Sequence, residues 1–331
     1  LILFLLTCAL VRERRQVVAI GIVFVVTELM TGVLGNWRYF VTLQRSLGGH
    51  DSLLAHEDSY FLLLYLVALG VSLFWWRVRR LSLVLVLCSP LVLMALIQNN
   101  RRAGIDATAI TFICFLILAI RFRPDARRWA ILSGAVIGGA YAILAAASWH
   151  VQYGLRSELV SPIRSILGQA TARDLSSDAY RTAENANLIF TYHLSPITGW
   201  GLGKDFLTPR PMVNISNFYS LWNLLPHNSL LWVPMSMGVI GLVTFWGLVG
   251  LALMESIRAI RVPDDRLIQG LGAFCVCAIV AELVFAYADL QLESPRNMVT
   301  WGILLGLVNL APRLAARRRG APPSEELLDG D

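Results

Sequence analysis

Apolar runs of about 20 residues recur along the whole chain, and they constrain its fold more than any other feature. A helix of about 20 residues crosses a hydrocarbon core about 30 Å thick. Only 15% of the 331 residues are charged, whereas an average soluble domain has about 25%. We therefore predict an all-α fold, a polytopic transmembrane helix bundle. The expected spans cover residues 1–11 (in part), 16–36, 60–76, 81–98, 105–121, 129–149, 228–254, 268–289 and 297–312.

The first residue, Leu1, already lies inside an apolar run that ends at Arg12. The basic leader and small-residue cleavage site of a signal peptide are both missing from this run. We interpret it as the end of a span and expect further spans upstream. On this interpretation residues 1–331 form a single transmembrane domain that is amino-terminally truncated.

Arginine clusters alternate with the spans in a way that predicts the topology. Five such segments fall on one side of the membrane, and the positive-inside rule assigns that side to the cytoplasm. They are residues 12–15, 77–80, 121–128, 255–266 and 313–319. Residues 313–331 then form a cytoplasmic tail, disordered after Arg319, and residues 150–227 form a large outward (periplasmic) loop containing short helices. A nucleic-acid partner would require one contiguous basic face instead, so we expect membrane lipids and no nucleic acid.

One outward turn breaks the charge rule, because it carries Arg101 and Arg102. These arginines could meet phospholipid headgroups or pair with Glu28, Asp106 or Asp289. They could equally form an anion site. The acids Glu28 and Glu282 lie inside spans, where burial of a carboxylate is costly and marks functional candidates or structural pairs with arginine.

The large outward loop contains a helix of its own. Ser177 or Asp178 can cap its start, and Pro196 ends it. Four side chains share one face of this helix: Arg181, Glu184, Asn185 and Leu188.

A glycine-rich turn follows this helix and superficially resembles a nucleotide-binding loop at Gly203-Lys204. The resemblance fails, since Thr198 occupies the position of the required first glycine and Asp205 replaces the hydroxyl residue. We interpret Gly199, Gly201 and Gly203 as backbone positions that need positive φ or close approach.

The loop ends at Pro226-His227-Asn228, directly before the next span. The positive end of a helix dipole disfavours imidazolium there, so a neutral ring that can accept a proton is favoured. His227 is therefore a candidate general base. The alternative is an interfacial histidine bonded to a loop carbonyl. The sequence shows neither a metal-ligand cluster nor a nucleophile–base triad, and we expect no cofactor and no metal.

The order of these features resembles the O-antigen ligase and polymerase superfamily. An Asn-Asn-Arg-Arg turn is followed by an arginine on a loop helix, the Pro196–Gly203 motif and a His-Asn helix start. The similarity runs from about Ser89 to Leu253. It implies a glycosyltransferase of a bacterial cytoplasmic (inner) membrane, which moves a glycan from a polyprenyl (undecaprenyl) diphosphate to a hydroxyl on a glycan, lipid A core or another acceptor.

The resemblance also implies roles for individual residues. His227 would activate the acceptor hydroxyl, and Arg181 with Arg101 or Arg102 would contact the donor diphosphate. Many members have Ser-Arg-Gly where this chain has Asn100-Arg101-Arg102, so either arginine can be the equivalent one. Supporting parts are expected from Asn228, Glu184, Asn185, Gly199, Gly201, Gly203 and Lys204.

Physical chemistry supports a lipid-linked donor independently. Nucleotide sugars and ATP are not supplied outside the cytoplasmic membrane, so a glycosyl donor used there arrives already activated. Arginine forks bind the diphosphate leaving group bidentately, and direct displacement is the simplest mechanism. Two other classes of function remain open: a transporter of a small anion, and a membrane scaffold whose loop binds a partner.

Overall fold

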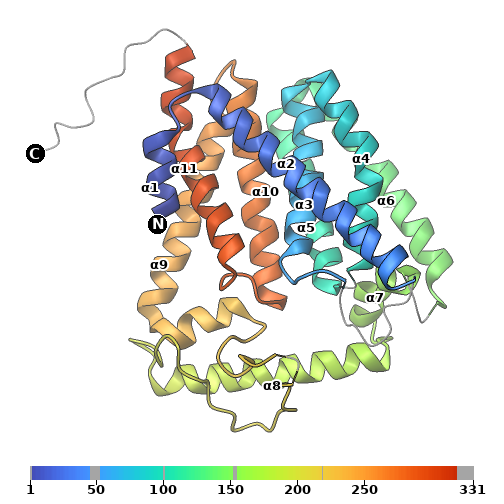
Figure 1. Cartoon of the computed structure of the whole chain (residues 1–331), viewed down its shortest axis with the longest axis vertical. Helices are drawn as coiled ribbons and strands as arrows, with labels where there is room; N and C mark the ends of the chain where they lie inside the picture. The colour runs from blue at the N-terminus through green and yellow to red at the C-terminus, as the bar shows by residue number, and fades with distance from the viewer. Residues whose placement is uncertain (1, 45–52, 100, 152–154, 218, 319–331) are drawn as a thin grey trace, which may run out of the picture.

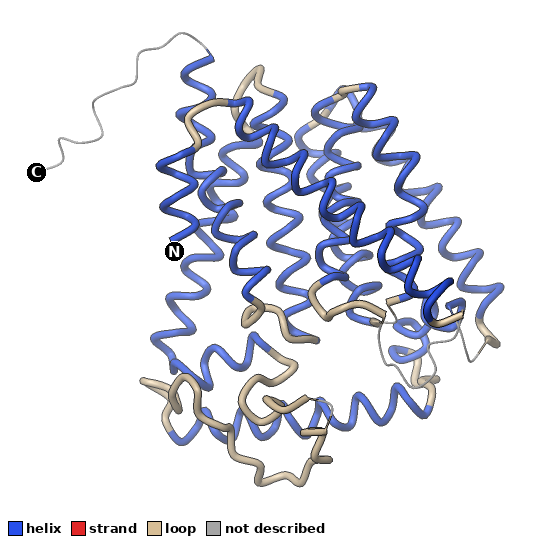
Figure 2. Tube along the Cα trace, in the orientation of Figure 1, coloured by secondary structure: helices blue, strands red, loops and turns tan. Residues whose placement is uncertain are grey.

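The computed structural model describes residues 2–44, 53–99, 101–151, 155–217 and 219–318, and this part of the chain contains helices and loops but no strand (Figure 2). The α-helices are α1 (Ile2–Leu10), α2 (Arg14–Trp37), α3 (Asp58–Val71), α4 (Arg79–Gln98), α5 (Arg102–Phe122), α6 (Arg127–Ser148), α7 (Leu155–Ile166), α8 (Ala172–Leu194), α9 (Ser229–Ile260), α10 (Arg266–Ala288) and α11 (Pro295–Arg318). Short π-helical turns extend α2 (Arg38–Thr42) and α3 (Ser72–Trp76), and a 3-10 turn (Pro124–Ala126) precedes α6.

Eight of the described helices, with their short extensions, are long and apolar enough to cross a membrane. They are α2 to α6 and α9 to α11, so the predicted polytopic helix bundle is confirmed. α9 and α11 continue beyond the predicted ends of their spans, to Ile260 and Arg318. Residues 313–318, the first part of the predicted cytoplasmic tail, are therefore helical, and the prediction of disorder after Arg319 lies outside the described residues.

α10 is the central helix of the bundle. It packs against α9, α5, α3 and α11, and most of its residues are buried. α2 and α6 lie at the periphery and expose apolar side chains such as Val26 and Ile143. This distribution suits a bundle in lipid, because the hydrocarbon solvates apolar side chains that water would drive inward.

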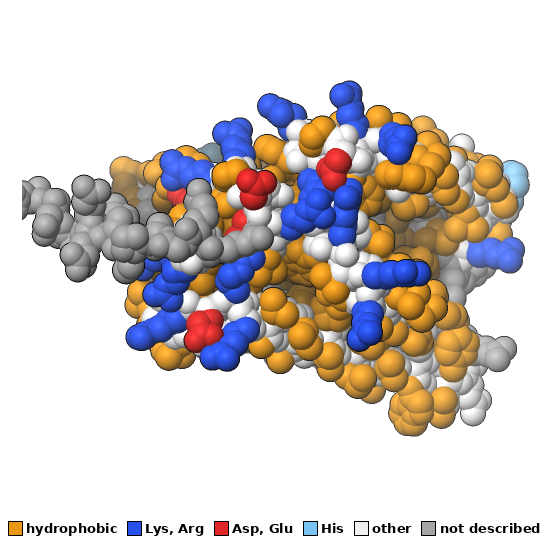
Figure 3. All heavy atoms as spheres, turned by 90° about the horizontal axis from the view of Figure 1, so that it is seen from above, with side chains coloured by type: hydrophobic (Ala, Val, Ile, Leu, Met, Phe, Trp, Pro, Cys, Tyr) orange, Lys and Arg blue, Asp and Glu red, His pale blue; other side chains and the backbone are white. Residues whose placement is uncertain are grey.

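The arginine-rich loops gather at one end of the bundle, which we call the arginine-rich end. Figure 3 looks onto this end and shows many Arg side chains with few acidic ones. Ion pairs join its loops: Arg14 pairs with Asp265 at the start of α10, and Arg77 contacts Asp125 at 2.8 Å. The structure thus brings together the segments that the charge pattern places on one side.

The opposite end carries a cap, made of α7, α8 and the described residues of segment 195–228. Figure 1 shows α8 lying across this end of the bundle, crosswise to the spans. α8 is longer than the expected short helix and begins before Ser177 and Asp178. Its N-cap is Thr171, whose hydroxyl accepts a hydrogen bond from the Asp174 amide (3.3 Å). The helix ends at Leu194, before Pro196, as predicted.

Candidate functional site

A buried carboxylate on α8 holds His227. Glu184 Oε2 accepts a hydrogen bond from the His227 backbone amide at 3.0 Å, and Oε1 lies 3.2 Å from Nδ1 of the ring. The Glu184 side chain is 1% exposed and that of His227 is 19% exposed. A carboxylate accepts hydrogen bonds, so in the neutral ring Nδ1 carries the proton and Nε2 has the lone pair. In the described part of the chain, Nε2 has no hydrogen-bond partner.

α8 brings further groups to this ring. Tyr180, one turn before Glu184, packs edge-on against His227, with ring centroids 5.7 Å apart. Burial, followed by the charge of Glu184, raises the pKa of Tyr180, so its phenol stays protonated. Its hydroxyl is buried without a partner among the described residues, as is Oδ1 of Asn185. The predicted face of the loop helix thus points toward the bundle, with Glu184 and Leu188 buried.

The glycine-rich turn fixes the helix segment that follows His227. α9 breaks at Gly238, whose φ is +66°. A Cβ there would lie 2.1 Å from the Ile197 carbonyl oxygen, and a Cβ at Gly199 would lie 2.3 Å from the Ser236 backbone. Only glycine permits this backbone-to-backbone contact.

The turn also satisfies backbone groups that the break in α9 leaves without helical partners. Trp200 and Gly201 donate their amides to the carbonyls of Met235 (2.7 Å) and Ser236 (3.0 Å), and Val239 donates to Pro196 (2.8 Å). Gly199, Gly201 and Gly203 all have positive φ, as predicted. The turn therefore supports the start of α9, and His227 stands immediately before that start.

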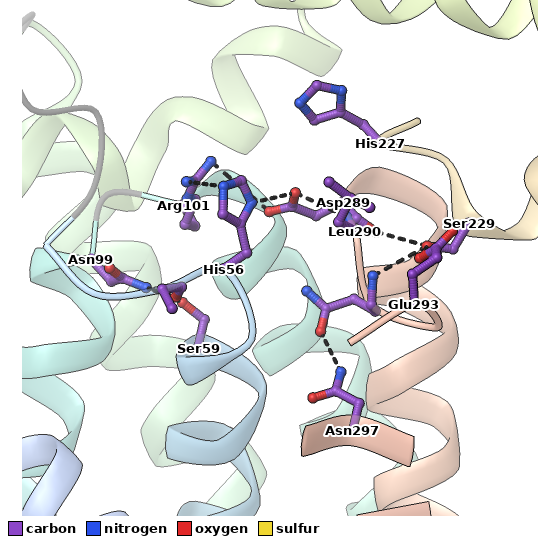
Figure 4. A network of polar contacts seen from close by, with 12 residues as sticks. His56, Ser59, Asn99, Arg101, His227, Ser229, Asp289, Leu290, Glu293 and Asn297 are labelled. Atoms are coloured by element: carbon purple, nitrogen blue, oxygen red, sulfur yellow. Dashed lines mark hydrogen bonds and ion pairs between the residues drawn. The ribbon is translucent and has the colours of Figure 1, made fainter. Parts of the chain in front are cut away.

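A second histidine–carboxylate pair lies at the same end of the bundle. Nδ1 of His56, just before α3, lies 2.7 Å from Oδ1 of Asp289, just after α10. On the other side of the ring, Nε2 lies 2.9 Å from a terminal nitrogen of Arg101. Figure 4 shows His56 between Arg101 and Asp289. The interpretation that Arg101 pairs with Asp289 is thus right in part, because their closest nitrogen–oxygen distance is 3.9 Å and His56 joins them.

Arg102 has different surroundings from its neighbour. Its guanidinium contacts Asp178 on α8 at 2.6 Å and Asp174 at 3.4 Å, and it donates to the Ser165 hydroxyl of α7 at 3.1 Å. Two carboxylates balance one guanidinium here. Arg102 therefore ties the start of α5 to the cap.

Arg181 is the third arginine of the predicted anion site. Among the described residues, none forms a hydrogen bond or an ion pair with its guanidinium. Burial, only partly offset by Asp289, lowers the pKa of Arg181, and Arg102 and Arg101 lower it further. A cation buried near other cations without a hydrogen-bonded partner is a favourable binding position for an anion.

Asp289 links these groups electrostatically. Its side chain is 1% exposed, and burial alone would raise the pKa of its carboxyl. The hydrogen bond from His56 and the nearby positive charge of Arg101 hold that pKa well below its usual range instead. Figure 4 shows the His227 ring extending toward the side where Arg101, His56 and Asp289 lie. The structure thus brings His227, Arg101 and Arg181 to one end of the bundle, around a charged Asp289.

Comparison with known proteins finds a family match for part of the chain. Residues 87–246, from α4 into α9, match the family described as O-antigen ligase. This stretch of the chain, which contains the Arg101 turn, α8, the glycine-rich turn and His227, is similar to O-antigen ligases. Among curated proteins, none matches the chain. The match supports a glycosyltransferase-like ligase or polymerase activity for this multi-pass membrane protein, a class that in general takes a lipid-linked glycan donor and a glycan acceptor.

A buried chain of polar side chains continues inward from the start of α9. Ser229 donates to Glu293 Oε2 at 2.6 Å and accepts from the Gln291 amide at 3.1 Å. Asn297 donates to Gln291 (2.7 Å) and to Glu282 (3.0 Å). Glu282 thus has an amide partner rather than the expected arginine. Burial raises the pKa of Glu293 to about 7.

Of the remaining predicted residues, Asn228 lies next to His227 and Lys204 lies apart from the site. Asn228 is the N-cap of α9 and accepts from the Leu231 amide at 3.0 Å, and its Nδ2 is buried without a described partner. Lys204 lies over the Trp200 ring, 5.6 Å from the centroid, and makes no described contact with His227 or the arginines. His56 was not predicted. The available signal was a histidine in an outward loop at the start of a span.

Proposed function

We propose that this membrane protein transfers a glycan from a polyprenyl diphosphate to an acceptor hydroxyl at the cap end. We further propose that this end faces the periplasm of a bacterial cytoplasmic membrane, as the positive-inside rule predicts for the face opposite the arginine-rich end. The observation that carries the proposal is His227: it has one nitrogen held by Glu184 and the other unpartnered among the described residues. It lies at the same end of the bundle as Arg101 and Arg181, and all three interact electrostatically with Asp289.

The base chemistry follows from the proton positions. Nε2 of His227 accepts the proton of the acceptor hydroxyl as its oxygen attacks the anomeric carbon of the donor sugar. The bond between that carbon and the diphosphate oxygen breaks, and its electron pair leaves with the polyprenyl diphosphate. Glu184 stabilises the imidazolium that forms, since its carboxylate accepts from the protonated Nδ1.

The arginines provide the charge that the leaving group needs. We assign this part to Arg101 and Arg181. The guanidinium of Arg181 has no described partner, and that of Arg101 contacts a neutral acceptor. Arg102 is less suited, because Asp174 and Asp178 already balance its charge. A fixed cation in a water-poor site stabilises developing negative charge strongly.

The test is release of the leaving group by the purified protein. Protein in lipid nanodiscs is incubated with an undecaprenyl-diphosphate-linked oligosaccharide and a panel of hydroxyl acceptors: lipid A core, a second oligosaccharide repeat unit and a peptide. We expect undecaprenyl diphosphate to be released in equal amount to elongated acceptor. His193→Asn is a matched control, since His193 is an exposed histidine on the same helix as Glu184.

The outcome also separates the competing functions. Anion flux in proteoliposomes without any release of undecaprenyl diphosphate would replace the transferase proposal with transport. Neither flux nor release, for any acceptor of the panel, would favour a scaffold. The acceptor that supports release distinguishes a ligase from a polymerase.

A further inference from the structure

We propose that His56 is a positioning residue that fixes the guanidinium of Arg101 for the donor diphosphate while leaving its positive charge only partly compensated. The inference rests on the proposed function, since it assigns a part in diphosphate binding. It concerns a residue outside the motifs that identify the family match, which begins at residue 87.

The hydrogen bonds determine the state of the His56 ring. An arginine only donates, so Nε2 of His56 accepts from Arg101 and carries no proton. The ring proton is then on Nδ1 and is donated to Asp289 Oδ1 at 2.7 Å. His56 is neutral in this arrangement, and both ring nitrogens are occupied.

The turn that carries His56 is held on two sides. Asn99, at the end of α4, accepts from the Leu54 amide at 2.7 Å and donates to the Ser59 hydroxyl at 2.7 Å (Figure 4). Arg296 on α11 contacts Asp58 at 2.8 Å. Asn99 is fully buried and stands two residues before Arg101. Asn99 therefore links the turn that carries His56 to the segment that carries Arg101.

A histidine between Arg101 and Asp289 has a physical advantage over a direct ion pair. Arg102 illustrates the direct case, in which carboxylates at 2.6 and 3.4 Å balance the charge. Arg101 instead has a neutral partner at 2.9 Å and its nearest Asp289 oxygen at 3.9 Å. A neutral acceptor orients the fork without cancelling its charge, so the remaining N–H groups can bind an anion.

Only one of the five N–H donors of Arg101 is used by His56. Its Nε is buried without a partner in the described part of the chain, although the side chain as a whole is 18% exposed. A buried, unpartnered donor on a charged group is energetically costly. Binding of a diphosphate oxygen would satisfy such donors, which explains why the fork is kept in this state.

Two substitutions separate positioning of Arg101 from a merely structural link to Asp289. Glutamine places a carbonyl oxygen near the position of Nε2, so His56→Gln keeps an acceptor for Arg101. Asparagine places an amide nitrogen near the position of Nδ1, so His56→Asn keeps the donor to Asp289 and loses the acceptor. The measurement is binding of undecaprenyl diphosphate to the full chain in nanodiscs, with thermal unfolding checked for each variant.

We expect His56→Asn to weaken binding about 10- to 100-fold, as for loss of a hydrogen bond to a charged group, and His56→Gln to bind nearly as tightly as the wild type. In an Arg101→Ala background His56→Asn should have no further effect, because the two residues act as one unit. Asparagine binding better than glutamine, or equal effects with and without Arg101, would overturn the proposal. If His56→Asn does not fold, weak binding of undecaprenyl diphosphate by His56→Gln would overturn the proposal. Absence of binding by the wild type would instead contradict the proposed function.

Discussion

The cap end of the bundle holds two histidine–carboxylate pairs that differ in the partner of one ring nitrogen, Nε2. His227 is held through Nδ1 by Glu184, and its Nε2 has no partner among the described residues. His56 is held through Nδ1 by Asp289, and its Nε2 accepts a hydrogen bond from Arg101. Both carboxylates are 1% exposed, so the two rings are oriented by similar means.

The difference between the pairs shows that a buried carboxylate beside a histidine does not by itself make the histidine a general base. A ring with an open Nε2 can take a proton from a substrate hydroxyl. A ring whose Nε2 already has an arginine donor can only orient that donor. We therefore expect changes to the His227 pair to affect turnover and changes to the His56 pair to affect donor binding.

The largest expected effect comes from removing the charge of Glu184. In Glu184→Gln the amide oxygen can accept from the His227 backbone, which turns the amide nitrogen toward Nδ1. The ring proton then moves to Nε2 and the base is lost, so kcat should fall about 10²- to 10⁴-fold with donor binding little changed. Asp289→Asn is the matched change in the other pair and should weaken donor binding instead. If both variants lost kcat, or if both lost donor binding, the proposed distinction between the two pairs would be wrong.

Arg181→Ala should reduce the rate about 10²- to 10³-fold, because one electrostatic stabiliser of the leaving group is lost. Arg181→Lys should recover little, since an ammonium lacks the planar fork that binds phosphate oxygens bidentately. Initial rates of undecaprenyl diphosphate release measure both variants. Full activity of the lysine variant would show that Arg181 acts as a point charge.

The adjacent arginines should respond in different measurements. Arg102→Ala breaks contacts to Asp178, Asp174 and Ser165, so the free energy of unfolding should fall by about 1–3 kcal/mol. Arg101→Ala should affect stability less and donor binding more. Thermal unfolding and diphosphate binding, measured side by side, check the pair. If Arg102→Ala weakened diphosphate binding more than Arg101→Ala did and left the unfolding temperature unchanged, Arg102 would be the residue that binds the donor.

The smallest effect is expected at Glu293, behind His227. Burial raises the pKa of its carboxyl from 4.5 to about 7. The folded protein thus binds this proton more tightly than the unfolded chain does, and the resulting stabilisation is complete below about pH 4.5 and is lost as the pH rises through about 7.

Glu293→Gln should remove this pH dependence. The unfolding temperature of the wild type should fall between about pH 5 and about pH 8, and that of the variant should fall less. Ser229 keeps an acceptor in the amide oxygen, so the hydrogen bond itself is not the variable. Parallel curves for the two proteins would show that Glu293 has no part in the linkage.

The sequence predicted the spans well because their cause is local. A run of apolar residues of the right length must form a helix in hydrocarbon, where backbone groups have no other partners. The start of α8 was predicted wrongly, since Ser177 and Asp178 are good capping residues that here lie inside a helix capped by Thr171. Thr171 supplies a local cap of its own, since its hydroxyl accepts from the Asp174 amide, and the helix therefore begins earlier.

The residues of the site also differ in how far they can be predicted from local sequence. The motif around His227 could be recognised from a short stretch of sequence, whereas the His56 contacts join residues 45 and 233 positions apart. No local pattern encodes such a pair. The choice between Arg101 and Arg102 also depended on Asp174 and Asp178, which only the folded cap brings to Arg102.

The pH dependence of undecaprenyl diphosphate release, measured for the wild type and His227→Gln, tests the central claim that His227 is the base. The wild-type rate should fall on the acidic side as the ring becomes protonated. His227→Gln should be slower by about 10²- to 10⁴-fold while binding undecaprenyl diphosphate as tightly as the wild type. Near-normal turnover of the glutamine variant, with the acidic limb unchanged, would contradict the account.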